Sequence, residues 1–150
     1  MLVYRITLEK WSKSLTASGH AARWNSRGRF VVYTAGTRAL ACLENVVHRS
    51  GEGLNHLFKV MVIEVPDDVF IEKIHVADLP DGWHELESFH LTQQRGDNWL
   101  DGMKSAILAV PSAIIPQEQN YLFNLQYPDF QKVKLLRTED FVFDPRIKTT

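Results

Sequence analysis

The sequence predicts a single α+β domain built on a mixed, mainly antiparallel sheet with flanking helices. Its 150 residues suit one hydrophobic core. The 45% hydrophobic and 23% charged fractions are typical of a globular chain. Patterns for at least five strands and two helices follow one another without the regular alternation of a parallel α/β fold. We therefore expect residues 1–150 to form one domain.

Two strand patterns occupy the N-terminal part of the chain. Leu2–Thr7 is rich in residues that favour strands, and Arg29–Ala35 gives a second strand directly after Gly28. Residues 8–22 between them are polar and small, so we expect a loop there, with Ser18 and Gly19 at a turn.

A helix is predicted from Arg38 to about His48. Thr37 is its expected N-cap, and Ser50 and Gly51 are expected to end it. Its apolar stripe consists of Leu40, Leu43, Val46 and Val47.

The strongest strand pattern is Leu57–Val65, which the turn Pro66–Asp68 closes. A shorter strand is expected at Val69–Ile74. Residues 77–88 are predicted to form a loop with one helical turn, because they combine Pro, Asp-Gly and acidic residues.

The C-terminal part is predicted to add one helix and the closing strands. Leu91–Leu100 has the pattern of a short helix that ends near Gly102. Lys104–Val110 resembles a buried strand, which we expect Pro111 to stop. Gln131–Phe143 is expected to give one or two further strands.

Composition excludes several classes of protein. Seventeen Lys and Arg residues balance eighteen Asp and Glu residues, so direct nucleic acid binding is not expected. A single cysteine excludes an internal disulfide framework, and we expect a cytoplasmic, reducing location. The sequence has no apolar run near the length of about 18 residues that a membrane span needs.

Familiar catalytic motifs are absent. The sequence contains no Gly-rich phosphate loop, HExxH, CxxC or GxSxG. The histidines lack metal-ligand spacing, so no metal is expected. Cys42, in the middle of the first helix, is expected to be a small core residue. Ser112 follows a strand but lacks the strand-turn-helix elbow of a serine hydrolase.

Polar side chains in unusual places remain. Glu44 borders the apolar stripe of the first helix, and His48 lies one turn later on the same face. This pattern fits either a solvated pair or a carboxylate directed into a cleft beside the sheet.

Three further side chains each allow two interpretations. Tyr33, near the end of a strand, is either a core aromatic or part of a site. Arg23 lies beside alanines and Trp24, and Arg5 alternates with apolar residues of the first strand. Each arginine could form a structural ion pair or hold a phosphate or carboxylate group.

The stretch ARWNSRGRFVVYTAGTRALACLENVVH, residues 22–48, resembles the core block of the RES domain, a bacterial toxin domain. Ten positions separate Arg23 from Tyr33, and eleven separate Tyr33 from Glu44, as in that family. The resemblance continues through GDNWLDG at 96–102, AVPSAIIPQEQNYLFN at 109–124, YPDF at 127–130 and FDPR at 143–146. The chain has Leu125 and Tyr127 where the family pattern has Pro and His.

The resemblance implies an ADP-ribosyltransferase-like fold and a toxin that consumes NAD as its substrate, without a metal. The first hypothesis is a toxin of a type II toxin–antitoxin system that arrests growth. It would cleave the nicotinamide–ribose bond of NAD as a glycohydrolase or phosphorylase. The alternatives are an ADP-ribosyltransferase that modifies a host protein and a non-catalytic binding module on the same fold.

The resemblance also implies roles for individual residues. Glu44, Arg23 and Tyr33 would be catalytic, and Arg23 and Tyr33 would also bind NAD together with Arg5, His48 and Ser112. An Xre-family antitoxin would cover the active site. A homodimer is left open, and exposure of two of Trp11, Trp83 and Trp99 would indicate an interface.

Overall fold

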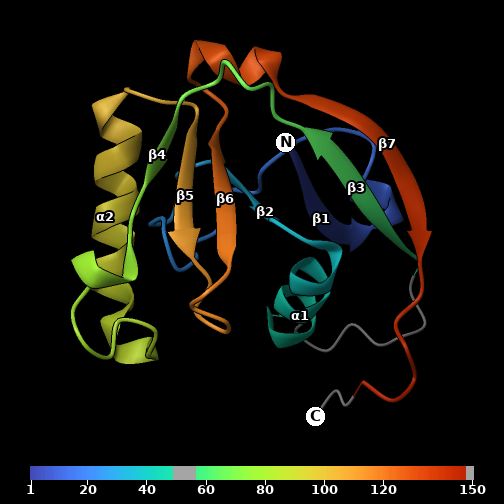
Figure 1. Ribbon diagram of the computed structural model, residues 1–150, viewed down its shortest axis with the longest axis horizontal. Coiled ribbons are helices and arrows are strands. Elements are labelled where there is room, and N and C mark those ends of the chain that lie inside the picture. The colour runs from blue at the N-terminus through green and yellow to red at the C-terminus, as the bar shows by residue number, and fades with distance from the viewer. Residues whose placement is uncertain (49–56, 148–150) are drawn as a thin grey trace.

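One sheet of seven strands runs through the protein, in the order β4-β5-β6-β2-β1-β3-β7 (Figure 1). The computed structural model describes residues 1–48 and 57–147. The strands are β1 (Leu2–Leu8), β2 (Val31–Ala35), β3 (Phe58–Glu64), β4 (Ile71–Lys73), β5 (Ile107–Pro111), β6 (Gln119–Asn124) and β7 (Lys134–Phe141). The α-helices within those residues are α1 (Arg38–His48) and α2 (Phe89–Gly102). Neighbouring strands are antiparallel except for β4 and β5, which confirms the predicted mixed sheet.

Most predicted elements are present. The Thr37 hydroxyl accepts a hydrogen bond from the Leu40 amide at 3.1 Å, so Thr37 caps α1 as predicted. The predicted end of this helix at Ser50 and Gly51 lies outside the described residues. Helix α2 begins at Phe89, two residues before its predicted start.

The second half of the chain differs from the prediction in two places. Strand β6 was not predicted, because prolines and polar residues precede it. Strand β5 begins three residues later than predicted and ends at Pro111, which is its last residue and lies opposite Gln119 of β6. The loop predicted at residues 77–88 contains the expected helical turn, a 3-10 turn at Leu86–Ser88. A second 3-10 turn, Val76–Asp78, begins one residue before the predicted loop.

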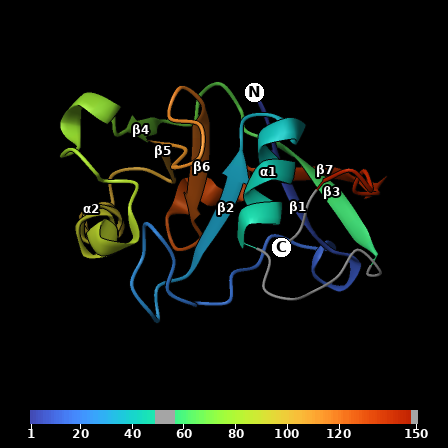
Figure 2. The ribbon, with the colours of Figure 1, turned by 90° about the horizontal axis from the view of Figure 1, so that it is seen from below.

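The sheet divides between its two central strands. Strand β1 pairs with β3 along its whole length, and β2 pairs along its whole length with β6. Between β1 and β2, the only register pair is Tyr4 with Ala35. The two strands therefore diverge from this point, and α1 lies beside both of them (Figure 2).

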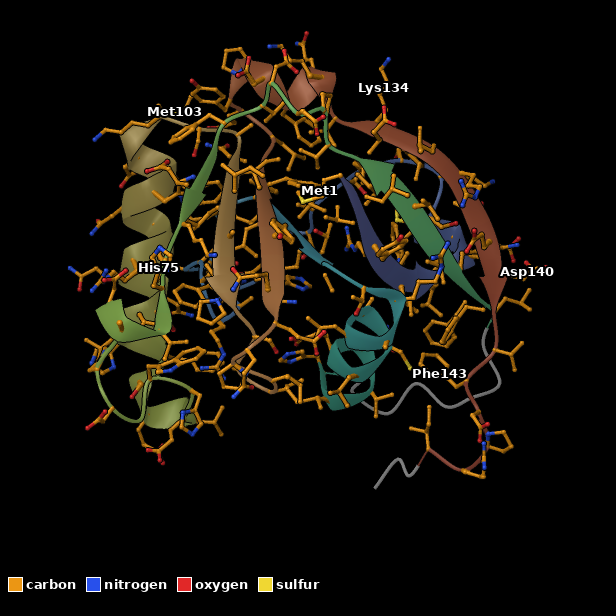
Figure 3. The ribbon with its side chains drawn as sticks, viewed as in Figure 1. Met1, His75, Met103, Lys134, Asp140 and Phe143 are labelled. Carbon is orange, nitrogen blue, oxygen red and sulfur yellow. The ribbon has the colours of Figure 1, made fainter. Side chains whose placement is uncertain are left out.

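Both helices cover the same face of the sheet. Leu40 and Ala41 of α1 pack with Ile6 and Ala35, whereas Trp99 of α2 belongs to a cluster that includes strands β5 and β6. Phe143, beyond β7, stacks edge-on against Phe58 at 4.9 Å and closes the α1 cluster (Figure 3). Neither of the described α-helices is long and apolar enough to cross a bilayer.

Helix α2 holds the loop that precedes β2. The Trp24 carbonyl oxygen lies so close to Gly96 that a Cβ atom there would be only 1.6 Å away. The Asp97 carboxylate accepts hydrogen bonds from the Ser26 amide at 3.1 Å and the Ser26 hydroxyl at 2.6 Å. Because Arg23 lies in this loop, contacts with α2 determine where that arginine is placed.

Replacing Gly96 by alanine should therefore destabilise the fold. The added methyl group must push the helix and the loop apart, at a cost of about 1–3 kcal/mol in the free energy of unfolding. Gly102→Ala is the matched control, because a Cβ atom at Gly102 meets nothing within 4 Å. Urea denaturation of the two variants measures the difference, and equal midpoints would contradict the proposed close contact.

Candidate functional site

A cavity of about 290 Å³ lies where β1 and β2 diverge, between the sheet and α1. Five of the six predicted site residues line it: Arg5, Arg23, Tyr33, Glu44 and His48. They come from β1, β2, α1 and the loop that α2 holds. Segments up to about forty residues apart in the sequence therefore meet at one site.

Glu44 is held at this cavity by two side chains. Its Oε1 accepts a hydrogen bond from the Ser112 hydroxyl at 2.8 Å, and its Oε2 lies 3.2 Å from Nε2 of His48. The Glu44 side chain is 21% exposed, whereas that of His48 is 62% exposed. Glu44 therefore forms the pair with His48 that one interpretation of the sequence expected, and it also lines the cleft that the other expected.

The Ser112 side chain contacts Glu44 but does not line the cavity. Its side chain is fully buried, and its oxygen accepts hydrogen bonds from the Ile114 and Ile115 amides, each at 3.1 Å. Because both amides donate, the single hydroxyl proton of Ser112 is directed to Glu44. The contact of Ser112 is thus with the carboxylate, although the resemblance implied a contact with NAD.

Arg23 is fixed against the wall of the cavity. Its guanidinium group lies 4.6 Å from the centre of the Phe89 ring, and Nη1 donates to the Trp83 carbonyl at 3.3 Å. Burial lowers the pKa of Arg23, while the negative charge of Glu44 raises it.

Arg5 reaches the cavity from a different direction. By alternation along β1 it points to the sheet face opposite Tyr4 and Ile6, yet it lines the cavity with them, so the cavity extends into the gap between β1 and β2. Its Nη1 donates to the Thr16 carbonyl at 3.1 Å, and burial lowers its pKa.

Neither arginine has an ion-pair partner in residues 1–48 and 57–147. Arg5 and Arg23 are absent from the carboxylate contacts within 4.0 Å that these residues form. Two partly desolvated cations without carboxylate partners favour an anionic ligand, which would restore the missing charge compensation.

The Tyr33 hydroxyl is bound to the loop that precedes β2. It donates to Oδ1 of Asn25 at 2.5 Å and accepts from the Trp24 amide at 3.1 Å. Burial raises the pKa of Tyr33 far above its usual value. Tyr33 lines the cavity, and its hydroxyl anchors the loop that carries Arg23.

Several cavity residues were not predicted. Tyr4, Asn45 and Asn120 line the cavity, and Asn45 donates through Nδ2 to the Ile6 carbonyl at 3.1 Å. Asn45 lies three residues before His48 and therefore near the same helix face, which is the signal that could have identified it. Asn120 lies on β6, the strand that was not predicted.

Two remaining expectations concern tryptophans and metals. Trp83 and Trp99 are buried in the core, and Trp11 is 57% exposed, so the paired exposure that would indicate an interface is not seen. Within the described residues, no group of three or more His, Cys, Asp or Glu side chains could hold a metal ion.

Comparisons with known proteins place this geometry in context. The family model of the RES domain matches residues 2–144. The "Prs ADP-ribosylating toxin" of Sphingobium sp. (strain YBL2) is 39% identical over 127 residues, which cover 83% of this chain and 79% of that protein. "Toxin Res" of Yersinia enterocolitica serotype O:8 is 32% identical over 154 residues, 99% of this chain and 100% of that protein.

The fold is also that of a solved structure. A chain in the crystal structure of the M. tuberculosis MbcT–MbcA toxin–antitoxin complex superposes with a TM-score of 0.74. The match covers 94% of this chain and 84% of that chain at 17% identity, so it confirms the predicted fold class.

The buried Tyr33 hydroxyl should make stability fall at alkaline pH. The folded state keeps the proton to a higher pH than the unfolded state, whose tyrosine ionises near pH 10. The protonated Tyr33 hydroxyl stabilises the fold fully below about pH 10. Above that pH, the free energy of unfolding falls by about 1.4 kcal/mol per pH unit until the tyrosine of the folded state also ionises. Tyr33→Phe should show a shallower loss in denaturation curves between about pH 9 and pH 11, and parallel losses would contradict this.

Proposed function

Because the chain belongs to the RES domain family, we propose that it is the toxin of a toxin–antitoxin system and cleaves the nicotinamide–ribose bond of NAD. The observation that carries this proposal is the carboxylate of Glu44 on a cavity that also holds Arg5 and Arg23. The names of two relatives, "Toxin Res" and "Prs ADP-ribosylating toxin", support a toxin whose reaction involves the ADP-ribose part of NAD.

The charges of the cavity suit a dinucleotide. Arg5 and Arg23 would hold the diphosphate, because a guanidinium group can donate two parallel hydrogen bonds to phosphate oxygens. The Tyr33 ring would stack on the nicotinamide ring, which leaves its hydroxyl in the loop network.

Glu44 would act on the ribose. When the bond between C1′ and the nicotinamide nitrogen breaks, its electron pair neutralises the pyridinium ring and positive charge develops on the ribose. A carboxylate already held by Ser112 stabilises that charge without having to reorient. Water or phosphate then bonds to C1′ and loses a proton.

Transfer of ADP-ribose to a protein is the second candidate. The relative named "Prs ADP-ribosylating toxin" is the observation that favours it. The bond that breaks is the same, and only the acceptor differs. Mass spectrometry of a treated lysate separates the two: a protein carrying ADP-ribose supports transfer, and free ADP-ribose alone supports hydrolysis.

We also propose an antitoxin that covers the cavity. The similar fold in the MbcT–MbcA complex is that of a toxin crystallised with its antitoxin, and the resemblance implies an Xre-family protein. Co-elution of this protein with a candidate Xre-family antitoxin from a size-exclusion column tests this, and separate elution at micromolar concentration would contradict it.

Glu44→Gln should lower NAD consumption by about 100- to 1000-fold, because it removes the negative charge and keeps the shape of the side chain. NAD and nicotinamide are measured against time with purified protein. Glu87→Gln, an exposed position outside the cavity, is the control and should keep wild-type turnover. A folded Glu44→Gln variant as fast as wild type would exclude the role of Glu44.

No NAD loss with wild-type protein, even with phosphate and lysate supplied, would favour the third hypothesis, a binding module.

A further inference from the structure

We infer that Asn120 recognises the carboxamide group of the substrate and selects an amide over the corresponding acid. This inference rests on the proposed function, because it takes the leaving group to be a nicotinamide ring. Asn120 has no role in the steps described above.

The strand register places the Asn120 side chain on the cavity face of the sheet. Asn120 of β6 lies directly opposite Ala35 of β2, and directly opposed residues of an antiparallel pair share a face. Tyr33 lies on that face too, as the diagonal neighbour of Asn120, at about 7–8 Å. Both residues line the cavity, and the small side chain of Ala35 beside them leaves room for a ligand.

The backbone of the neighbouring strand β2 orients the Asn120 amide. Its Nδ2 donates to the Thr34 carbonyl at 3.3 Å. One N–H of that nitrogen and Oδ1 make no further hydrogen bond within residues 1–48 and 57–147. A donor and an acceptor, both neutral, are thus available on one amide of fixed orientation.

Several other polar side chains of the cavity are already engaged. The Thr34 hydroxyl donates to the Tyr121 carbonyl at 2.8 Å, and both oxygens of Glu44 have partners. The Tyr33 hydroxyl is used by Asn25 and Trp24. Asn45 is held by its bond to the β1 backbone. Asn120 is therefore a cavity amide that still offers both a donor and an acceptor to a polar group of the ligand.

A primary carboxamide is the complementary ligand group. Its N–H can donate to Oδ1 of Asn120 while its oxygen accepts from Nδ2, which gives two hydrogen bonds between two planar amides. A carboxylate in the same place would bring a negative oxygen against Oδ1 and leave that acceptor unpaired. Sites that pair a ligand group in this way reject analogues without it more strongly than apolar contacts do.

The test compares amide and acid ligands in two assays. Turnover of NAD is compared with turnover of nicotinic acid adenine dinucleotide, and binding of nicotinamide with binding of nicotinate by saturation-transfer NMR. The proteins are wild type, Asn120→Ala and the near-isosteric Asn120→Leu. Asn98→Ala, exposed on α2 and outside this cavity, is the control. Thermal melts establish which variants are folded.

Wild type and Asn98→Ala should prefer the amide in both assays. In the Asn120 variants the ratio of kcat/KM values for amide over acid should fall about 10- to 100-fold, mainly through KM. A general loss of structure would lower kcat/KM equally for both substrates and leave this ratio unchanged. An unchanged ratio in a folded Asn120 variant, or wild type that binds nicotinamide and nicotinate equally, overturns the inference.

The two proposals can fail separately. Wild type that consumes NAD, with a ratio that Asn120 does not affect, keeps the proposed function and overturns the role of Asn120. Wild type that binds nicotinamide through Asn120 but does not consume NAD keeps the recognition and overturns the reaction.

Discussion

The structure depends on the separation of two adjacent strands that would otherwise form a continuous ladder. Strands β1 and β2 share one register pair, Tyr4 with Ala35, and diverge on the side where α1 lies. Backbone groups facing the gap lose their ladder partners, and buried backbone groups need others. One asparagine side chain meets part of this need, because Asn45 donates to the Ile6 carbonyl of β1. The gap is therefore stabilised in part by a side chain that also lines the cavity.

Each chemically important group of the cavity is held by a residue outside it. Ser112, itself oriented by two backbone amides, holds Glu44. Asn25 holds the Tyr33 hydroxyl, and the Asn25 amide in turn donates to three carbonyls of the same loop. The Trp83 carbonyl and the Phe89 ring hold Arg23. Prearranged charges and dipoles are what a reaction with developing positive charge requires, because they need not reorganise as the bond breaks.

Local patterns made much of this site predictable. The spacing of four residues placed Glu44 and His48 on one face of α1, and Thr37 marked the start of that helix. The position of Ser112 could not be predicted from its surroundings, because it depends on the β5–β6 connection folding back against α1. Strand β6 was not predicted for a related reason. The segment that precedes it contains Pro111 and Pro116, and these prolines hide the strand pattern that follows. The direction of Arg5 requires knowledge of the gap, since alternation alone assigns it to the other face.

The arrangement also explains how distant parts of the chain act on the cavity. Gly96 of α2 allows the Trp24 backbone to approach the helix, and the Trp24 amide in turn donates to the Tyr33 hydroxyl. Asp97 holds Ser26 in the same loop. The resemblance to the RES family in the block GDNWLDG, which begins at Gly96, thus has a physical basis that is separate from substrate contact. The helix fixes one wall of the cavity, and Ser112 fixes the carboxylate on another. Substitutions at Gly96 or Ser112 therefore change where Arg23 or Glu44 lies in the cavity, although neither Gly96 nor Ser112 lines the cavity.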